Sequence, residues 1–314
     1  MSRSEDLFNS TLGGNGSFNT VMPEDFELAP ATLSTISFAI TFLLGVPGNC
    51  AVIWVTGFKM ERRVHTVCFL KLAVADLAYC LTLPFHLAMF FDLSSFPQDD
   101  SFFIFFGCVV IINMSASSFL LTLISIFRCL VVIRPIWFRH QLSLDWVYVS
   151  CFGAWVLAFL MSLPNLMFEW IILYFGENTS LFLEVTWDVF IFGLPVLIMS
   201  TCYIMIGRIL QMADLAKSQK PVRLIVTVVV AFIICWLPNI ACSLLRDISD
   251  AFLNDWLALT FALASFNSAL NPLLYVFPGR DFRRVFRRSL TASLHLAFTE
   301  EDLPHPALTV ARQA

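Results

Sequence analysis

Seven long apolar runs, separated by short polar joints, constrain this chain more than any other feature. Each run is long enough for a helix that crosses a bilayer, which needs about 20 mostly apolar residues. Only 13% of the 314 residues are charged, against about a quarter in an average soluble domain. The pattern predicts an all-α membrane protein with a seven-helix bundle. The runs cover residues 33–58, 65–91, 102–133, 146–168, 182–211, 221–245 and 255–277.

The bundle, residues 33–277, is expected to form one domain, with an additional segment of chain on each side of it. Residues 1–32 form the predicted amino-terminal tail, and residues 278–314 form the predicted carboxyl-terminal segment. In that segment Phe282 and Phe286 lie four residues apart, with arginines around them. This spacing predicts a short amphipathic helix on the membrane surface after the seventh span.

Basic residues predict the orientation of the bundle, because cytosolic joints carry an excess of Lys and Arg. Lys59, Arg62 and Arg63 follow the first run, and further arginines follow the third and seventh. The amino terminus is therefore expected outside the cell. The opposite, outer joints are rich in Asp and Glu, which either attract a cationic ligand or simply solvate the loops. The same side would hold three sugar-acceptor patterns, at Asn9, Asn15 and Asn178.

A few polar side chains stand inside the apolar runs. Asp76 lies in the middle of the second run, Asn113 and Ser117 in the third, and Asn267 and Asn271 in the seventh. Each of the two pairs is spaced by four residues and so shares one helix face. A carboxylate among amide and hydroxyl oxygens suits a small hard cation or a proton. It equally suits a structural hydrogen-bond network between helices.

Prolines interrupt three of the runs, at Pro195, Pro238 and Pro272. Each removes a backbone hydrogen bond and weakens its helix at one level, which favours a bundle that rearranges over a rigid pore. No internal repeat supports a transporter or channel built from inverted halves. No catalytic pair or metal-ligand spacing appears in any joint, so we expect no enzymatic activity.

Together these motifs resemble the rhodopsin-like G protein-coupled receptors, over about residues 30–295. The motifs "GVPGN", "LAVAD", "FRC", Trp155, Pro195 with Tyr203, "CWLP" and "NPLLY" follow one another in the family's order. The stretches "NMSASSFLLTLIS" and "RCLVVIRPIW" are similar to the chemoattractant group, which includes formyl-peptide, anaphylatoxin C3a and chemerin receptors. The resemblance implies a multi-pass plasma-membrane receptor that senses an extracellular peptide or lipid-like ligand. It also implies chemotactic signalling through heterotrimeric G proteins of the inhibitory class.

The resemblance implies roles for the matched positions. A sodium ion, acting as an allosteric modulator in a protein that otherwise needs no cofactor, would lie among Asp76, Asn113, Ser117, Asn267 and Asn271. The activation switch would consist of Arg128, Tyr203, Trp236, Pro238, Asn271, Pro272 and Tyr275. The G protein would contact Arg128. Arrestin and membrane lipids are further implied partners, and no nucleic acid is expected.

The ligand pocket departs from the pattern of the group. Formyl-peptide and C3a receptors place an arginine on helix five, where this chain has Trp187 followed by Asp188. Val110 stands where amine receptors need an acid. The pocket that remains is aromatic and apolar with an acidic rim, which suits a cationic amphipathic peptide or a lipid-like ligand, although any one aromatic could instead serve helix packing. It would comprise His86, Val110, Ile111, Met114, Trp187, Asp188, Trp236, Asn239 and Phe261.

Two further departures concern the switch and the outer loops. In the family an acid precedes the arginine of the third helix, whereas here Phe127 precedes Arg128. Loss of this resting clamp would either favour activity or spoil coupling, so a scavenger that binds and internalises ligand without signalling remains an alternative. The family's outer disulfide also lacks its partners, because Phe103 occupies the helix-three position and residues 169–182 contain no cysteine.

Overall fold

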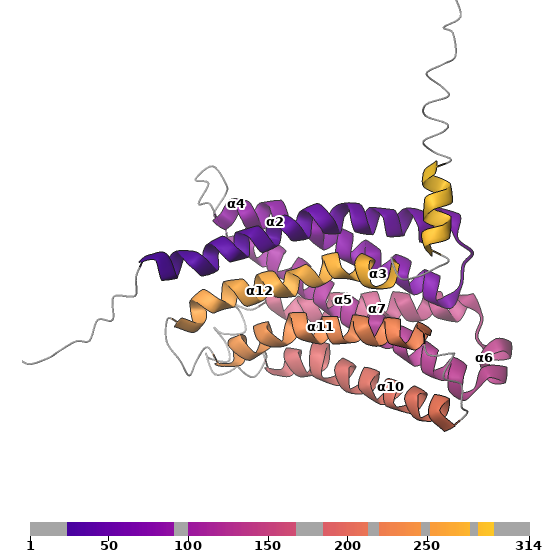
Figure 1. The fold of residues 1–314 in the computed structure, drawn as a ribbon. Coiled ribbons are helices and arrows are strands. Elements are labelled where there is room, and N and C mark those ends of the chain that lie inside the picture. The colour runs from indigo at the N-terminus through magenta and orange to yellow at the C-terminus, as the bar shows by residue number, and fades with distance from the viewer. Residues whose placement is uncertain are drawn as a thin grey trace, which may run out of the picture.

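The computed structural model describes residues 24–90, 100–167, 185–212, 220–245, 252–276 and 282–291. Within these ranges the chain is helical apart from short turns and connections, and the long helices lie side by side as one elongated bundle (Figure 1). Seven helical segments are long and apolar enough to cross a membrane, which confirms the predicted fold. They cover Thr32–Lys59, Val64–Ala88, Ile104–Ile133, Leu144–Pro164, Val185–Met212, Val226–Leu245 and Trp256–Leu274.

The elements follow one another along the chain with short breaks. Their order is α2 (Glu24–Trp54), η1 (Val55–Lys59), α3 (Val64–Cys80), α4 (Leu83–Phe90), α5 (Asp100–Ile133), α6 (Pro135–Gln141), α7 (Leu144–Leu166), η2 (Val189–Gly193), α10 (Leu194–Met212), α11 (Lys220–Leu245), α12 (Phe252–Asn271) and η4 (Pro272–Val276). A last helix covers residues 282–291.

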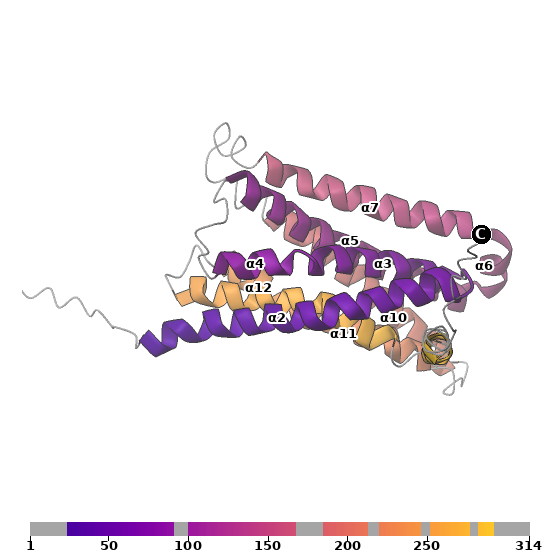
Figure 2. The same cartoon turned by 90° about the horizontal axis from the view of Figure 1, so that it is seen from above.

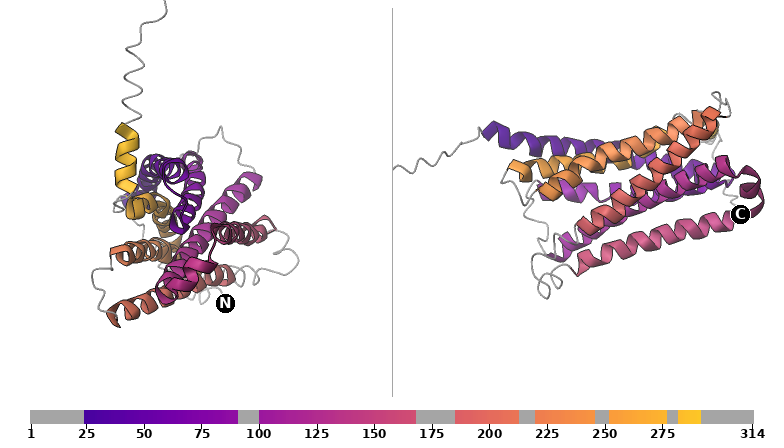
Figure 3. Two further views of the ribbon diagram at one scale, coloured as in Figure 1. Left: turned by 90° about the vertical axis from the view of Figure 1, so that its right-hand side faces the viewer. Right: turned by 90° about the horizontal axis from the view of Figure 1, so that it is seen from below.

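Helix α5 lies in the middle of the bundle. It packs between α7 on one side and α3 on the other (Figure 2), and it also contacts α10. On the far side of α3, α2 packs against α12, which in turn contacts α11. Figure 3 shows the bundle from one end and from below. Large apolar side chains such as Leu43, Phe152 and Leu197 remain exposed on the outside. An apolar exterior of this kind suits lipid as the surrounding solvent.

Two of the three irregular turns of the described long helices lie at or near a proline. The π-helical turn η2 ends two residues before Pro195, and η4 begins at Pro272. The Ser118 hydroxyl on α5 donates a hydrogen bond to the Ile191 carbonyl inside η2. This bond gives the Ile191 carbonyl a donor from a neighbouring helix, which helps the bundle to tolerate the irregular turn.

The helix over residues 282–291 confirms the predicted amphipathic segment. Phe282 is buried, its ring lies 6.1 Å from that of Phe286, and Phe286 meets the Trp54 ring edge-on at 6.4 Å. Its arginines are exposed: Arg283, Arg284, Arg287 and Arg288. Figure 1 shows this helix, in yellow, lying across one end of the bundle. We call this the basic end, because η1 with Lys59 and the connection with Arg62 and Arg63 lie there as well.

Gly45 allows α2 to approach α3 closely. A Cβ at this position would lie 2.5 Å from the Cys80 Sγ, whereas a Cβ at Gly153 on α7 would meet nothing within 4 Å. Gly45→Ala is therefore expected to lower the unfolding free energy by about 1–3 kcal/mol through overpacking. Gly153→Ala should be neutral or slightly stabilising. Thermal unfolding of purified protein measures both, and adding Cys80→Ala should rescue Gly45→Ala. Failure of that rescue would contradict the steric explanation.

Candidate functional site

Asp76 accepts hydrogen bonds from three side chains on two other helices. It is fully buried on α3. Its Oδ2 accepts a hydrogen bond of 2.8 Å from the Asn271 amide on α12. Its Oδ1 accepts from the Asn113 amide and the Ser117 hydroxyl on α5, both at 3.4 Å. The structure thus brings together four of the five residues predicted to surround a cation.

Two further polar residues extend this network, and neither was assigned to the site from sequence. The Ser268 hydroxyl donates to the Asn113 side-chain oxygen at 3.3 Å. The Asn49 amide on α2 donates to the backbone carbonyls of Ser268, at 3.0 Å, and Gly45, at 2.9 Å. The network therefore joins α2, α3, α5 and α12. The sequence signal for Ser268 was its place inside "FNSALN", between the two predicted asparagines.

Asn267 stands apart from the hydrogen-bonded set. Its side chain is buried, yet neither its amide nitrogen nor its oxygen has a hydrogen-bond partner within the described residues. The side-chain oxygen of Asn271 likewise has no donor there. Buried amide groups normally find partners, so each of these two oxygens is available to accept a further ligand.

The donor set fits a hard cation such as sodium. Carboxylate, amide and hydroxyl oxygens are the ligands that hard cations prefer. The two 3.4 Å contacts to the Asp76 Oδ1 are longer than ordinary hydrogen bonds, so that oxygen is only weakly held by the protein. Of the predicted ligands, the network gathers Asp76, Asn113, Ser117 and Asn271, and with Asn267 these residues would hold the ion.

Trp236 lies next to an aromatic row in the middle of the bundle. It is buried on α11, and its ring follows those of Phe232 and Phe192, with centroid distances of 6.4 Å and 5.8 Å along the row. Phe192 belongs to η2 and Pro238 lies one half-turn beyond Trp236 inside α11. The Trp236 Nε1 has no acceptor within the described residues. The row couples the irregular turn before Pro195 to the proline-bearing stretch of α11.

His86 lies in a cluster of aromatic rings near the other end of the bundle. Its imidazole is 5.4 Å from the Phe106 ring, 5.9 Å from Phe261, 6.1 Å from Phe38 and 6.4 Å from Tyr79, measured between centroids. Its Nε2 is buried and has no hydrogen-bond partner in the described part of the chain. We call these five residues the outer aromatic cluster. Of these five residues, only His86 and Phe261 were predicted from the sequence, and the packing of α2, α3 and α5 adds Phe38, Tyr79 and Phe106.

The remaining predicted ligand residues are distributed over three helical segments. Val110, Ile111 and Met114 are half-buried on α5, as are Trp187 and Asp188 on the short helical stretch before η2. Val110 packs against the core that contains Phe38 and Tyr79, and Met114 packs against the core that contains Trp236. Asn239 on α11 donates to the Thr260 hydroxyl at 3.5 Å.

Arg128 lies on α5, near the basic end of the bundle. Phe127 beside it is 7% exposed and belongs to the main core. Arg128 forms no ion pair or hydrogen bond within the described residues, where the one ion pair joins Arg63 to Glu61 at 2.9 Å. Tyr203, another predicted member of the switch, shares a 2.9 Å hydrogen bond with Ser125. Phe127 therefore leaves the arginine without the acid that the family's pattern supplies.

Several predicted positions fall outside what the structure describes. These are the sugar-acceptor residues Asn9, Asn15 and Asn178, residues 169–182, and the side chains of Phe103 and Tyr275. Cys108, the cysteine nearest the expected disulfide position, lies buried against α7, with its Sγ 3.8 Å from the Ser162 carbonyl oxygen. Every cysteine in the described ranges is a free thiol.

Comparison with known proteins points to one family. The family model described as "7 transmembrane receptor (rhodopsin family)" matches residues 48–275. A C3a anaphylatoxin chemotactic receptor from Danio rerio is 36% identical, over 90% of this chain and 81% of the relative. The corresponding receptor from Oncorhynchus mykiss is 34% identical, over 86% and 80%. N-formyl peptide receptor 2 from Homo sapiens is 33% identical, over 87% of each protein.

Proposed function

Because this chain belongs to the rhodopsin family of seven-transmembrane receptors, we propose that it couples an extracellular chemoattractant to a heterotrimeric G protein of the inhibitory class. Its chemoattractant-type relatives are receptors rather than enzymes. One observation supports the coupling most directly. The network around Asp76 links four helices between the outer aromatic cluster and Arg128, so a ligand at one end can bias helix positions at the other.

The proposed ligand is a cationic amphipathic peptide, with a lipid-like molecule as the second choice. The outer aromatic cluster offers ring faces that attract a cation and apolar surface for an aliphatic chain. Asp188, half-buried before η2, would contribute the negative charge. Trp187 replaces the arginine that would pair with a peptide carboxylate, so a free carboxyl terminus is not the expected contact.

The proposed orientation places the amino terminus outside the cell at the plasma membrane. It is supported by the arginines and lysine of the basic end, which cytosolic surfaces favour. The amino-terminal sugar-acceptor patterns would then be glycosylated. In this orientation the G protein, and arrestin after it, would approach Arg128 between α3, α5 and α10.

Sodium is proposed to stabilise the resting state by binding beside Asp76. Its positive charge would offset the charge of the Asp76 carboxylate between α3, α5 and α12. Activation would rearrange the helices at Pro238 and Pro272, with Trp236, Tyr203 and Tyr275 moving as parts of the same switch. A ligand acts on this equilibrium only by its difference in affinity for the two states.

Cell-based G protein activation tests the proposal. We expect cells that express the receptor without added ligand to exceed the empty-vector level of inhibitory G protein activation. Arg128→Ala should return activity to that level at equal surface expression. A pertussis-toxin arm, which blocks the inhibitory class, should remove the same signal and so identify the G protein class.

The same assay separates a signalling receptor from a scavenger. The absence of an acid beside Arg128 is the observation that favours the scavenger. Cells are then exposed to libraries of cationic amphipathic peptides, with internalisation followed beside G protein activation. Uptake of a peptide that never activates G protein, at matched receptor surface levels, would establish the scavenger and contradict the coupling proposed above.

A further inference from the structure

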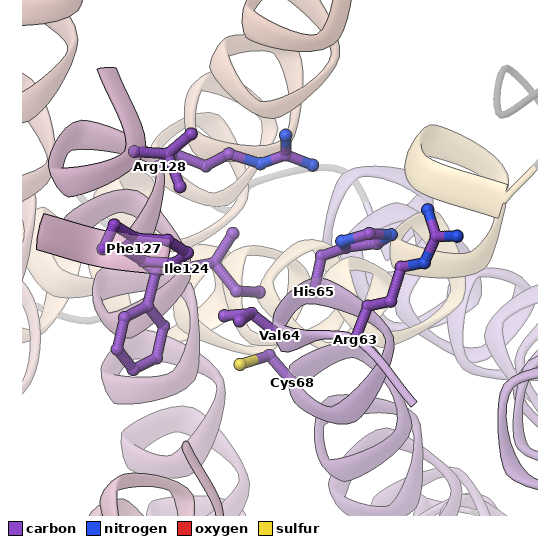
Figure 4. A pocket seen from close by; sticks show the side chains of 9 residues that line it. Arg63, Val64, His65, Cys68, Ile124, Phe127 and Arg128 are labelled. Carbon is purple, nitrogen blue, oxygen red and sulfur yellow. The ribbon is translucent and has the colours of Figure 1, made fainter. Parts of the chain in front are cut away.

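A pocket opens beside Arg128 at the basic end of the bundle (Figure 4). Its volume is about 220 Å³, and it lies between the start of α3, the end of α5 and Phe138 of α6. The nitrogen-bearing ends of Arg63, His65 and Arg128 lie on one side of it, and Ile124 and Val64 lie on the other. The pocket therefore has a basic side and an apolar side.

The positive charge of this pocket is only partly compensated. Arg128 has no ion-pair partner within the described residues, and the acid that would neighbour it in related receptors is replaced by the apolar Phe127. Arg63 pairs with Glu61, but both side chains are largely exposed, at 64% and 82%. An exposed pair of this kind is weak and readily exchanged. Arg128 therefore lacks an acidic partner among the described residues, and Arg63 has only an exposed one.

The first turn of α3 adds to this preference for an anion. Its N-cap residue is Arg63, which offers no side-chain hydrogen bond to the turn, and no acidic residue lies in that turn. The first amides of a helix lack acceptors within the helix and carry the positive end of its dipole. Val64 and His65, the first two residues of this helix, line the pocket.

We propose that this pocket binds the phosphomonoester headgroup of an anionic membrane lipid, of the phosphatidic acid class. The phosphate would lie between Arg63 and Arg128 and would replace the missing internal acid as the resting partner of Arg128. The apolar side of Val64, Ile124 and Val131 would contact the start of the lipid's glycerol and acyl region. The bound lipid would hold Arg128 near α3 and so act as an exchangeable clamp.

The dimensions support a small headgroup. A volume of about 220 Å³ corresponds to roughly seven water molecules at about 30 Å³ each. That space has room for a phosphate with a few attached carbons. A phosphomonoester also offers the several acceptor oxygens that two guanidinium groups can share.

Lipid binding to the full-length receptor tests this proposal. The receptor is placed in nanodiscs of phosphatidylcholine with either phosphatidic acid or phosphatidylserine of the same acyl chains, and retained lipid is measured by native mass spectrometry. We expect about tenfold preference for phosphatidic acid, since charge-assisted hydrogen bonds differ by that order. Equal retention of both lipids would overturn the proposal. Both leaflets hold the same lipid, so the result depends neither on orientation nor on G protein coupling.

Two substitutions with matched controls locate the site. Arg63→Gln should weaken phosphatidic acid retention about tenfold, whereas Arg208→Gln, an exposed arginine of α10 outside the pocket, should change it less than twofold. Phe127→Asp should remove the preference by supplying an internal acid, and Phe127→Leu should keep it. Equal effects of the two arginine variants would mean general surface attraction and would overturn the proposal. The proposal would also be overturned if inorganic phosphate raised the unfolding temperature of the receptor as much as phosphatidic acid does, because the pocket would then be a site for free anions.

Discussion

Asp76→Ala is expected to lower the unfolding free energy of the receptor by about 3 kcal/mol. The substitution removes the shared acceptor of Asn271, Asn113 and Ser117, and each buried donor left unsatisfied costs about 1–3 kcal/mol. The substitution also removes the cost of burying a carboxylate, which offsets part of this destabilisation. The apparent unfolding temperature should fall by about 6–12 °C, measured by thermal unfolding in detergent.

Asp76→Asn is the matched control for this effect. Asparagine keeps the side-chain shape and one acceptor oxygen. Asp76→Asn should therefore lower the unfolding free energy much less than Asp76→Ala does. If Asp76→Ala unfolded at the wild-type temperature, the network would have no stabilising role. Added sodium chloride, compared with choline chloride at equal ionic strength, should raise the unfolding temperature of wild type but not of either variant. An equal sodium effect in all three proteins would contradict the proposed sodium site.

Phe127→Asp is expected to lower ligand-free G protein activation about tenfold, which corresponds to roughly 1.4 kcal/mol in the balance between resting and active states. The new carboxylate would stand next to Arg128, in a partly buried place where water screens the pair only weakly. An ion pair there would hold the arginine in its resting position. The measurement is basal G protein activation at equal surface expression.

Phe127→Leu separates the charge effect from the loss of an aromatic ring. Phe127 belongs to the main core, and shortening it alone costs packing energy without supplying an acid. Basal activity should therefore stay near wild type in Phe127→Leu. Unchanged basal and stimulated signalling in Phe127→Asp would show that this position does not govern the switch.

The membrane spans illustrate what periodicity and composition can predict. In lipid every backbone polar group must be satisfied within its own segment, so a sufficiently long apolar run becomes a helix whatever surrounds it. The seven predicted spans accordingly match the helices to within a few residues. The helix over residues 282–291 was predictable from its periodicity, because Phe282 and Phe286, four residues apart, share one face of a helix.

The polar network around Asp76 could be predicted only in part from the sequence. Four-residue spacing places Asn113 with Ser117, and Asn267 with Asn271, on common helix faces. Yet Asn271 donates to Asp76 while Asn267 has no partner among the described residues, and Ser268 joins the network instead. The outcome depends on how α12 is rotated against α3 and α5. Rotation follows from side-chain packing between helices, which no single helix encodes.

The sequence by itself determined the number, approximate length and order of the membrane spans and the motifs that place the chain in its family. These properties depend on neighbours along the chain and on the cost of exposing backbone to lipid. Only the tertiary structure decided that Phe38, Tyr79 and Phe106 surround His86, and that Arg63 and His65 share a pocket with Arg128. Those contacts join helices far apart in sequence, so they exist only once crossing angles and rotations are set.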